Sequence, residues 1–359
     1  TERLVGSEMC IRDRLNSLHS LTDLMNILKK LLVLIIFGLA LTAHSNERDI
    51  ITIKGNHLHV NNEMYFMKGL CYHPVPKGET ARSFYNLDQD LALMVEAGVN
   101  TIRVYEPIDD KEVLDKLDAA GIKVIINFGY NNPNAFDIAT GGFIEYIQKY
   151  KDHNAILLWE LGNEYNYHPE WFGGDINIWY KILDIAAGLI KMIDESRPVS
   201  TAHGELPQDD VLAYGKNIDI WGVNVYRWDK PASILREWRI KNVKKPIYYA
   251  EAGADSYMAT TQLGYFEGES QEAQADANRN ILQAIIENKK HNAGVMLFQF
   301  TDGWWKAGNP DQHDKGGWAP NSGGVPYDGA PNEEWWGIVD IDRNKKLTFD
   351  VVKQAYTQN

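Results

Sequence analysis

The chain has 359 residues, a formal net charge of −13 and 44% hydrophobic residues. An acidic chain of this kind is a poor partner for nucleic acid and for anionic membrane surfaces, because both repel negative charge. Its length suits one large domain or two small ones.

A candidate secretory signal peptide spans Met25 to Ser45. Lys29 and Lys30 supply its positive start, an apolar run follows, and small residues precede a predicted cut after Ser45. The apolar run is too short to predict a membrane span. We therefore expect a secreted or periplasmic protein without stable membrane insertion after cleavage, with an uncleaved anchor as the alternative. Residues 1–24 are interpreted as an extraneous leader, so residues 46–359 form the expected folded domain.

Cys71 is the one cysteine after the predicted cut, since Cys10 lies in the leader. An internal disulfide is therefore not expected in the mature chain. Because Cys71 lies in an apolar run, we interpret it as a buried structural thiol rather than a nucleophile.

The predicted elements begin with a small antiparallel cap, built from short runs at 51–53, 57–60 and 64–66 with turn residues between them. Eight apolar runs then alternate with helical patterns. The predicted strands are Met67–Tyr72, Thr101–Tyr105, Lys123–Phe128, Ile156–Gly162, Val199–Ala202, Ile218–Val225, Ile247–Glu251 and Gly294–Phe300. The predicted helices are Leu87–Ala97, Lys111–Ala120, Gly142–Tyr150, Ile176–Ser196 and Ser270–Asn288. This alternation favours an α/β fold, a single closed (β/α)8 TIM barrel with a short N-terminal antiparallel β cap.

A long irregular stretch, Asn309 to Pro331, follows the eighth predicted strand and is rich in Gly, Pro, Asp and Asn. Such a stretch inside a compact domain indicates a functional loop, here over the barrel mouth. Asp311 and Asp314 do not have the spacing of a calcium loop. His, Asp and Glu residues form no cluster with metal-ligand spacing elsewhere, so we predict no metal and no cofactor.

Polar or aromatic residues stand at the C-terminal ends of all eight predicted strands, where barrel enzymes gather their active sites. These residues are His73, Arg103, Tyr105, Asn127, Asn163, Glu164, His203, Asn224, Tyr226, Glu251, Trp304 and Trp305. Glu164 and Glu251 are carboxylates that end buried strands. Cleavage of a glycosidic bond needs such a pair, because one group protonates the leaving oxygen while the other attacks or stabilises the sugar carbon. A sugar-cleaving enzyme is therefore the main hypothesis.

From about Phe66 to Trp305 the chain resembles the retaining glycoside hydrolases of clan A, which share the (β/α)8 barrel. In that clan the acid/base glutamate follows an asparagine at the end of strand four, as in Gly162-Asn163-Glu164, and the nucleophile ends strand seven, as in Tyr249-Ala250-Glu251. The resemblance implies that Glu164 is the acid/base and Glu251 the nucleophile, and that Asn163 binds the sugar 2-hydroxyl. It further implies that Arg103 and Tyr226 hold Glu251, and that an aromatic residue after strand eight floors the central subsite.

Two stretches, Met67 to Pro74 and Gly98 to Tyr105, are similar to the β-1,3-glucanosyltransferases and their glucanase relatives. They are also similar to the barrel domains of the β-galactosidase/β-glucuronidase family. We therefore expect an oligo- or polysaccharide substrate, a β-linked glucan with a β-1,3 linkage as first choice. Transglycosylation, a β-galactosidase-type or β-mannanase-type activity, and a non-catalytic carbohydrate-binding barrel are the alternatives.

Retention of configuration requires the carboxyl groups of Glu164 and Glu251 to lie about 5 Å apart. Glu160 is the rival acid, but it lies deeper on the same side of its strand and is interpreted as a buried structural carboxylate. His73 and His203 are candidates for substrate binding, with satisfied core histidines as the alternative. Exposed tryptophans in predicted loops, Trp171, Trp228 and Trp304 among them, are expected to stack on sugar rings.

Overall fold

The computed structural model describes residues 48–131, 136–317 and 327–358. The predicted leader and signal peptide lie outside these ranges, as does the middle of the predicted mouth loop. Within the described ranges, no helix has both the length and the apolar character that crossing a bilayer requires.

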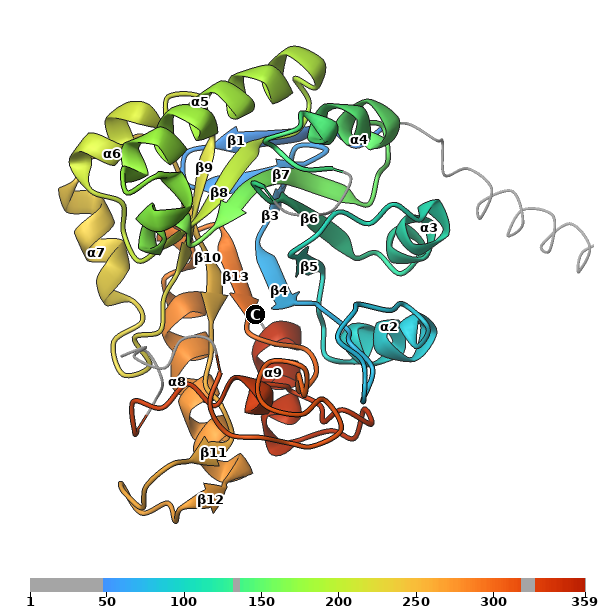
Figure 1. Ribbon diagram of the computed structural model, residues 1–359, viewed down its shortest axis with the longest axis vertical. Coiled ribbons are helices and arrows are strands. Elements are labelled where there is room, and N and C mark those ends of the chain that lie inside the picture. Colours follow the sequence, from blue (N-terminus) through green and yellow to red (C-terminus); the bar gives the residue numbers. More distant parts are fainter. Residues whose placement is uncertain (1–47, 132–135, 318–326, 359) are drawn as a thin grey trace, which may run out of the picture. The chain divides into compact units, whose positions relative to one another are not determined.

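Eight parallel strands close into a barrel in the order β10-β13-β4-β5-β6-β7-β8-β9, with helices around its outside (Figure 1). The barrel strands are β4 Met67–Cys71, β5 Thr101–Val104, β6 Lys123–Phe128, β7 Ile156–Asn163, β8 Val199–Gly204, β9 Ile220–Asn224, β10 Ile247–Ala252 and β13 Gly294–Leu297. The helices are α2 Leu87–Glu96, α3 Lys111–Ala119, α4 Gly142–Tyr150, α5 Ile176–Ile193, α6 Asp209–Tyr214, α7 Ser233–Ile240, α8 Gln271–Glu287 and α9 Leu347–Thr357. The prediction of a TIM barrel is confirmed.

The sequence patterns located all eight barrel strands, with ends that differ by a few residues. The helices α6, α7 and α9 are absent from the predicted set. The first two have 6 and 8 residues and are too short to show a clear helical period, whereas α9 has 11 residues. Side-chain caps fix several helix starts: Asp110 accepts a hydrogen bond from the Glu112 amide at α3, and Ser270 accepts one from the Ala273 amide at α8.

Apolar side chains alternate between the inside and the outside of the barrel. In β10, Tyr248 and Ala250 belong to the interior cluster, whereas Ile247 and Tyr249 belong to the layer between strands and helices. This two-residue period lets each strand bury both of its faces, as the uniformly buried pattern of β10 shows.

The N-terminal cap is a three-stranded antiparallel sheet of β1 Ile51–Lys54, β2 His57–Val60 and β3 Glu63–Tyr65. Its buried Ile51 and Leu58 join the interior cluster of the barrel. Met67, the first residue of β4, belongs to the same cluster. The cap therefore packs at the end of the barrel where the strands begin, which leaves their C-terminal ends for the site.

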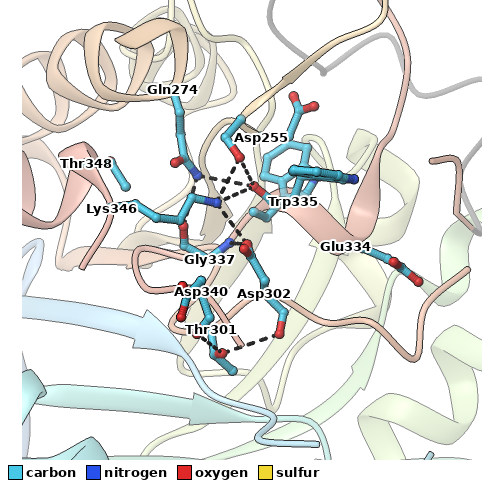
Figure 2. Close-up of polar contacts among 12 residues, drawn as sticks. Asp255, Gln274, Thr301, Asp302, Glu334, Trp335, Gly337, Asp340, Lys346 and Thr348 are labelled. Atoms are coloured by element: carbon cyan, nitrogen blue, oxygen red, sulfur yellow. Dashed lines mark hydrogen bonds and ion pairs between the residues drawn. The ribbon is translucent and has the colours of Figure 1, made fainter. Parts of the chain in front are cut away.

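A buried polar network anchors the chain that follows β13 (Figure 2). The Lys346 ammonium, before α9, donates to Ser256 Oγ at 2.8 Å, to Asp302 Oδ1 at 2.9 Å and to the Trp335 carbonyl at 3.0 Å. Asp302 Oδ1 also accepts from the Gly337 amide at 2.8 Å. A buried ion pair is stable when further hydrogen bonds satisfy its charged groups, and these contacts use all three protons of the ammonium and give Asp302 Oδ1 a second donor.

Glu334, which is 0% exposed, ties the loop after β13 to this network. Its carboxylate accepts from the amides of Ala307 at 2.9 Å and Asp314 at 2.5 Å, and its carbonyl accepts from the Gly303 amide at 3.0 Å. Three points of the loop are thereby fixed to one buried side chain and its backbone.

We predict that Lys346→Met lowers the free energy of unfolding by about 3–5 kcal/mol, because it leaves the Asp302 carboxylate buried without its counter-ion. Urea denaturation measures the change. Lys345→Met is the matched control, since Lys345 pairs with Glu96 at 2.7 Å at the surface, where the two side chains are 42% and 39% exposed. Its expected cost is below about 1 kcal/mol. Equal losses for the two variants would contradict the assigned role of the network.

Candidate active site

The guanidinium of Arg103, in β5, lies at the centre of the predicted site and is 0% exposed. Its Nε donates to Glu160 Oε1 at 2.8 Å, Nη1 to Glu251 Oε1 at 2.9 Å and Nη2 to Asn163 Oδ1 at 2.8 Å. One rigid side chain therefore sets the relative positions of residues from β7 and β10.

Glu251, 5% exposed near the end of β10, accepts hydrogen bonds on both carboxylate oxygens. Tyr105 donates to Oε1 at 2.7 Å, in addition to Arg103, and Tyr226 donates to Oε2 at 2.6 Å. A guanidinium and two phenol hydroxyls thus direct three donors at this carboxylate and hold it in one orientation. Burial and the charge of Glu251 raise the pKa of the Tyr226 phenol well above its usual value, so this donor keeps its proton.

Glu164 directly follows β7 and has a different environment. Burial, followed by the negative charge of Glu251, raises the pKa of its carboxyl group to about 7, against an opposing hydrogen bond from Asn224. The group therefore keeps its proton at a pH where Glu251 must be ionised to act as a nucleophile. Asn224, which donates to Asn163, also lies beside Glu164, so Glu164 shares neighbours with the residues that Arg103 holds.

The backbone turns sharply where β7 ends. Gly162 has φ of 70° and Glu164 has φ of 56°, both in the left-handed region. A Cβ on Gly162 would lie 2.6 Å from the Trp179 ring, so glycine is required at this position. The Glu164 amide donates to the Ala202 carbonyl at 2.9 Å, which fixes the turn against β8. A non-glycine residue in this conformation is a form of local strain that is typical of functional sites.

Asn163 and Asn224 connect the surroundings of the two carboxyl groups. Asn163 Oδ1 accepts from Arg103 and also from Asn224 Nδ2, at 3.1 Å. The second amide oxygen, Asn224 Oδ1, is buried without a hydrogen-bond partner among the described residues. An unfilled buried acceptor beside two carboxyl groups suits a ligand hydroxyl.

Glu160 supports the site from below, as its interpretation as a structural carboxylate implies. It is 0% exposed and accepts from Arg103, from Asn127 Nδ2 at 2.8 Å and from Tyr248 OH at 2.5 Å. These donors occupy both of its oxygens, so Glu160 is not positioned to act as the acid.

Two further predicted residues join the group on the side of β4. The His73 ring lies 5.0 Å from the Trp305 ring and 6.2 Å from the Tyr105 ring, measured between centroids. Burial lowers the pKa of His73 to about 3, so its imidazole is neutral. Cys71 is a free, buried thiol whose pKa burial raises to about 12, and the prediction of a structural cysteine is confirmed.

The structure does not bring His203 to this group. Its Nε2 pairs with Tyr180 OH of α5 at 3.1 Å and its Nδ1 with the Gly204 carbonyl at 2.9 Å. Ala202 belongs to the interior cluster, so its neighbour His203 points outward, where its contacts are those of a satisfied core histidine.

Of the three tryptophans expected to stack on sugar rings, Trp228 and Trp304 pack on other side chains, and Trp171 is the exposed one. Trp228 packs on Tyr327 at 4.8 Å and Trp304 on His313 at 5.2 Å, with the Lys77 ammonium 4.2 Å from the Trp304 ring. Trp171 is 54% exposed and stacks on His168 at 3.9 Å, in the turn that follows Glu164.

Sequence reasoning missed two contributors to the site, Lys306 and Glu333. Tyr105 was among the predicted strand-end residues, and its hydroxyl contacts Glu251 directly. Lys306 and Glu333 lie in the loop after β13, and their charges act on Glu251 and on Glu164 respectively. Glu333 lies far in sequence from any strand end, which removes the positional signal by which the other residues were found, whereas Lys306 directly follows the predicted Trp305 and was not singled out.

Comparisons with known proteins match the barrel part of the chain. A family model described as "Glycosyl hydrolases family 2, TIM barrel domain" matches residues 51–306. A 1,3-beta-glucanosyltransferase of Arthroderma benhamiae is 23% identical over 232 residues, which cover 54% of this chain and 42% of that protein. The 1,3-beta-glucanosyltransferase gel1 of Aspergillus fumigatus is 32% identical over 129 residues, 32% of this chain and 28% of that protein. The chain thus spans less than half the length of these two curated relatives.

Solved structures with the same fold include enzymes of family 2. A β-galacturonidase from Eisenbergiella tayi has a TM-score of 0.62 at 23% identity, covering 87% of this chain and 55% of that chain. A β-glucuronidase from Bacteroides uniformis has a TM-score of 0.66 at 18% identity, covering 87% and 37%. The family match includes the strands that carry Arg103, Glu164 and Glu251. On this match, the chain belongs to glycosyl hydrolases family 2, of which it contains the TIM barrel domain.

Proposed function

We propose that this chain is an exported retaining β-glycosidase that acts on a β-linked glucan, with Glu251 as nucleophile and Glu164 as acid/base. The observation that carries the proposal is the opposed environment of the two carboxyl groups. Glu251 accepts hydrogen bonds from a guanidinium and two phenols, whereas burial and the charge of Glu251 raise the pKa of Glu164 to about 7. Double displacement requires one carboxylate that attacks and one carboxylic acid that keeps its proton until the leaving oxygen needs it.

In the first step Glu251 attacks the anomeric carbon and the bond to the leaving oxygen breaks, while Glu164 donates its proton to that oxygen. Bond formation neutralises the charge of Glu251, which removes the repulsion that held the proton on Glu164. Glu164 then takes a proton from water, whose oxygen attacks the same carbon and releases Glu251 as a carboxylate. Asn163, held by Arg103 and Asn224, is positioned to bind the 2-hydroxyl of the sugar.

A sugar hydroxyl in place of water would give transglycosylation by the same atoms. The names of the two fungal relatives, both 1,3-beta-glucanosyltransferases, favour this second candidate and a β-1,3 linkage. The exposed Trp171 beside the turn that carries Glu164 supports it, because an acceptor saccharide would bind on the side of the acid/base. A panel of β-1,3-, β-1,4- and β-1,6-glucans, β-mannan and β-galactan separates the substrates, and products longer than the substrate reveal transfer.

We expect Glu251→Gln to lower kcat on a β-glucan by at least about 10³-fold, because the amide is a poor nucleophile. The variant keeps the shape of the side chain, so saccharide binding measured by calorimetry persists. Glu287→Gln, at the exposed end of α8, is the control and leaves kcat unchanged. If Glu251→Gln kept full turnover, the assigned nucleophile would be wrong, and if the native protein bound saccharide without turnover, a non-catalytic barrel would be favoured.

The pH dependence of kcat/KM reports the proton on Glu164. Because the carboxyl group must be protonated and its pKa is raised to about 7, kcat/KM is expected to fall about tenfold per pH unit above that value. Glu164→Gln removes this alkaline limb when a dinitrophenyl glycoside, whose leaving group needs no proton, is the substrate. An alkaline limb that survives in Glu164→Gln would assign the titration to another group.

Retention is tested by proton NMR of the first product formed from a β-glycoside. The β-anomer is expected to form first and to mutarotate afterwards, because double displacement inverts the anomeric carbon twice. An initial α-anomer would mean that water attacks directly, and Glu251 would then be a base rather than a nucleophile.

A further inference from the structure

A second polar group borders the nucleophile on the side of β13 and β4. The barrel order places β13 next to β10, and β4 beyond it. Gln299 follows β13, His73 follows β4, and Trp305 and Lys306 lie in the loop after β13. We call these four residues the donor cluster. Glu164, the proposed acid/base after β7, lies on the other side of β10 in the barrel order, beyond β9 and β8.

The members of the donor cluster converge on one point. A Cβ on Gly303 would lie 3.3 Å from Gln299 Nε2, 3.3 Å from Trp305 Nε1 and 3.4 Å from Lys306 Cε. The fourth member, His73, packs on the Trp305 ring, and its ring also borders that of Tyr105, which donates to Glu251. The cluster is therefore adjacent to the nucleophile.

Several polar atoms of the cluster lack a partner within the described part of the chain. Gln299 is 3% exposed and its Nε2 has no hydrogen-bond partner there, nor has the buried Nδ1 of His73. Lys306 is 7% exposed, and the contacts of its ammonium are aromatic, the rings of Phe298 at 4.0 Å and Trp305 at 5.8 Å. Buried polar groups are costly without partners, so their concentration at one point indicates that a ligand supplies the acceptors.

The charges near Lys306 indicate the class of that ligand. Burial lowers the pKa of Lys306, and the carboxylates of Glu333 and Glu251 oppose this shift. Glu333 also raises the pKa of Glu164, so it faces the same pocket. Two cations, Arg103 and Lys306, are thus already balanced by three carboxylates, those of Glu160, Glu251 and Glu333, and a further carboxylate from a uronic acid would be repelled. Neutral hydroxyl groups accept hydrogen bonds from the cluster without this cost.

We propose, resting on the proposed glycosidase function, that the donor cluster is the glycone subsite and binds hydroxyl groups of a neutral pyranose. The leaving saccharide extends from the acid/base, on the β7 side. The retained sugar therefore presents the hydroxyl groups remote from its anomeric carbon, those at positions 4 and 6, to Lys306 and Gln299. A neutral hexoside is accordingly the substrate, and the corresponding uronide is excluded.

The test compares the neutral aryl β-glycoside that the native protein cleaves best with its 4-deoxy and 6-deoxy analogues and with the uronide. In the native protein, loss of the hydroxyl bound by Lys306 is expected to lower kcat/KM by about 10- to 100-fold, the effect of one hydrogen bond to a charged group. In Lys306→Met, kcat/KM for the substrate that keeps all its hydroxyl groups should fall by about the same factor. Removal of the hydroxyl group should then cause no further fall in kcat/KM. This convergence is a coupling between side chain and hydroxyl that a general structural defect does not produce.

Lys315→Met is the matched control. Its ammonium also lies over an aromatic ring, that of Tyr257 at 4.7 Å, but Lys315 does not belong to the cluster, and the variant should keep the native deoxy penalty. Gln299→Leu is the second variant. Gln299 Nε2 has no hydrogen-bond partner among the described residues. The thermal unfolding midpoint of Gln299→Leu should therefore not fall below that of the native protein, whereas its kcat/KM should fall about 10-fold.

The outcomes separate the inference from the function on which it rests. A native protein that cleaves no β-glycoside overturns the proposed function. A native protein that is active, but whose deoxy penalty is absent or unchanged by Lys306→Met, overturns only the donor cluster. Cleavage of the uronide at or above the rate of the neutral glycoside overturns the neutral class and assigns Lys306 to a substrate carboxylate.

Discussion

The buried guanidinium of Arg103 is the constraint on which the rest of the site depends. It forms an ion pair with Glu160 at 2.8 Å and with Glu251 at 2.9 Å, and both carboxylates are nearly or fully buried. Arginine suits this position because its planar group offers several donors in fixed directions and keeps its charge when desolvated. Glu160 makes the arrangement possible. Its carboxylate, deeper in the barrel, binds Nε of Arg103, and the two terminal nitrogens of the guanidinium remain to hold Glu251 and Asn163.

This arrangement creates two different carboxyl environments. Arg103 and Tyr105 at the end of β5, with Tyr226 after β9, surround Glu251 with donors, whereas Glu164 stands on a left-handed turn, and burial raises the pKa of its carboxyl group. The charge of Glu251 adds to that effect. The pKa of Glu164 therefore depends on the position of Glu251, and a substitution that moves Glu251 is expected to change it.

Much of this arrangement was predictable from the sequence, because the barrel brings the ends of distant strands to one rim. The apolar runs located the eight strands, and the pair Asn163 and Glu164 stood out by its position after β7. The direction of a side chain at a strand end was harder to predict. Ala202 points into the barrel, and successive residues of a strand point to opposite faces, so His203 points outward. Tyr105 was found as a strand-end residue, but its contact with Glu251 depends on packing across the barrel.

The loop after β13 shows the limit of prediction from periodicity. Its irregular sequence indicated function, yet the positions of its charged residues are fixed by Glu334, Asp302 and Lys346, which lie far apart in the chain. Contacts of this kind leave no local pattern, since each partner alone resembles an ordinary polar surface residue. They became evident only once the chain was folded.

The anchoring of that loop also separates two tasks physically. The strands β5, β7 and β10 hold the acids, while a C-terminal segment tied to α9 holds the residues around Gly303. On the proposed function, substitutions of uncharged residues in the segment would alter which sugar fits and leave the hydrogen bonds of Glu251 to Arg103, Tyr105 and Tyr226 in place. A protein divided in this way is suited to laboratory evolution, in which a library confined to the segment would explore new specificities on an unchanged reaction centre.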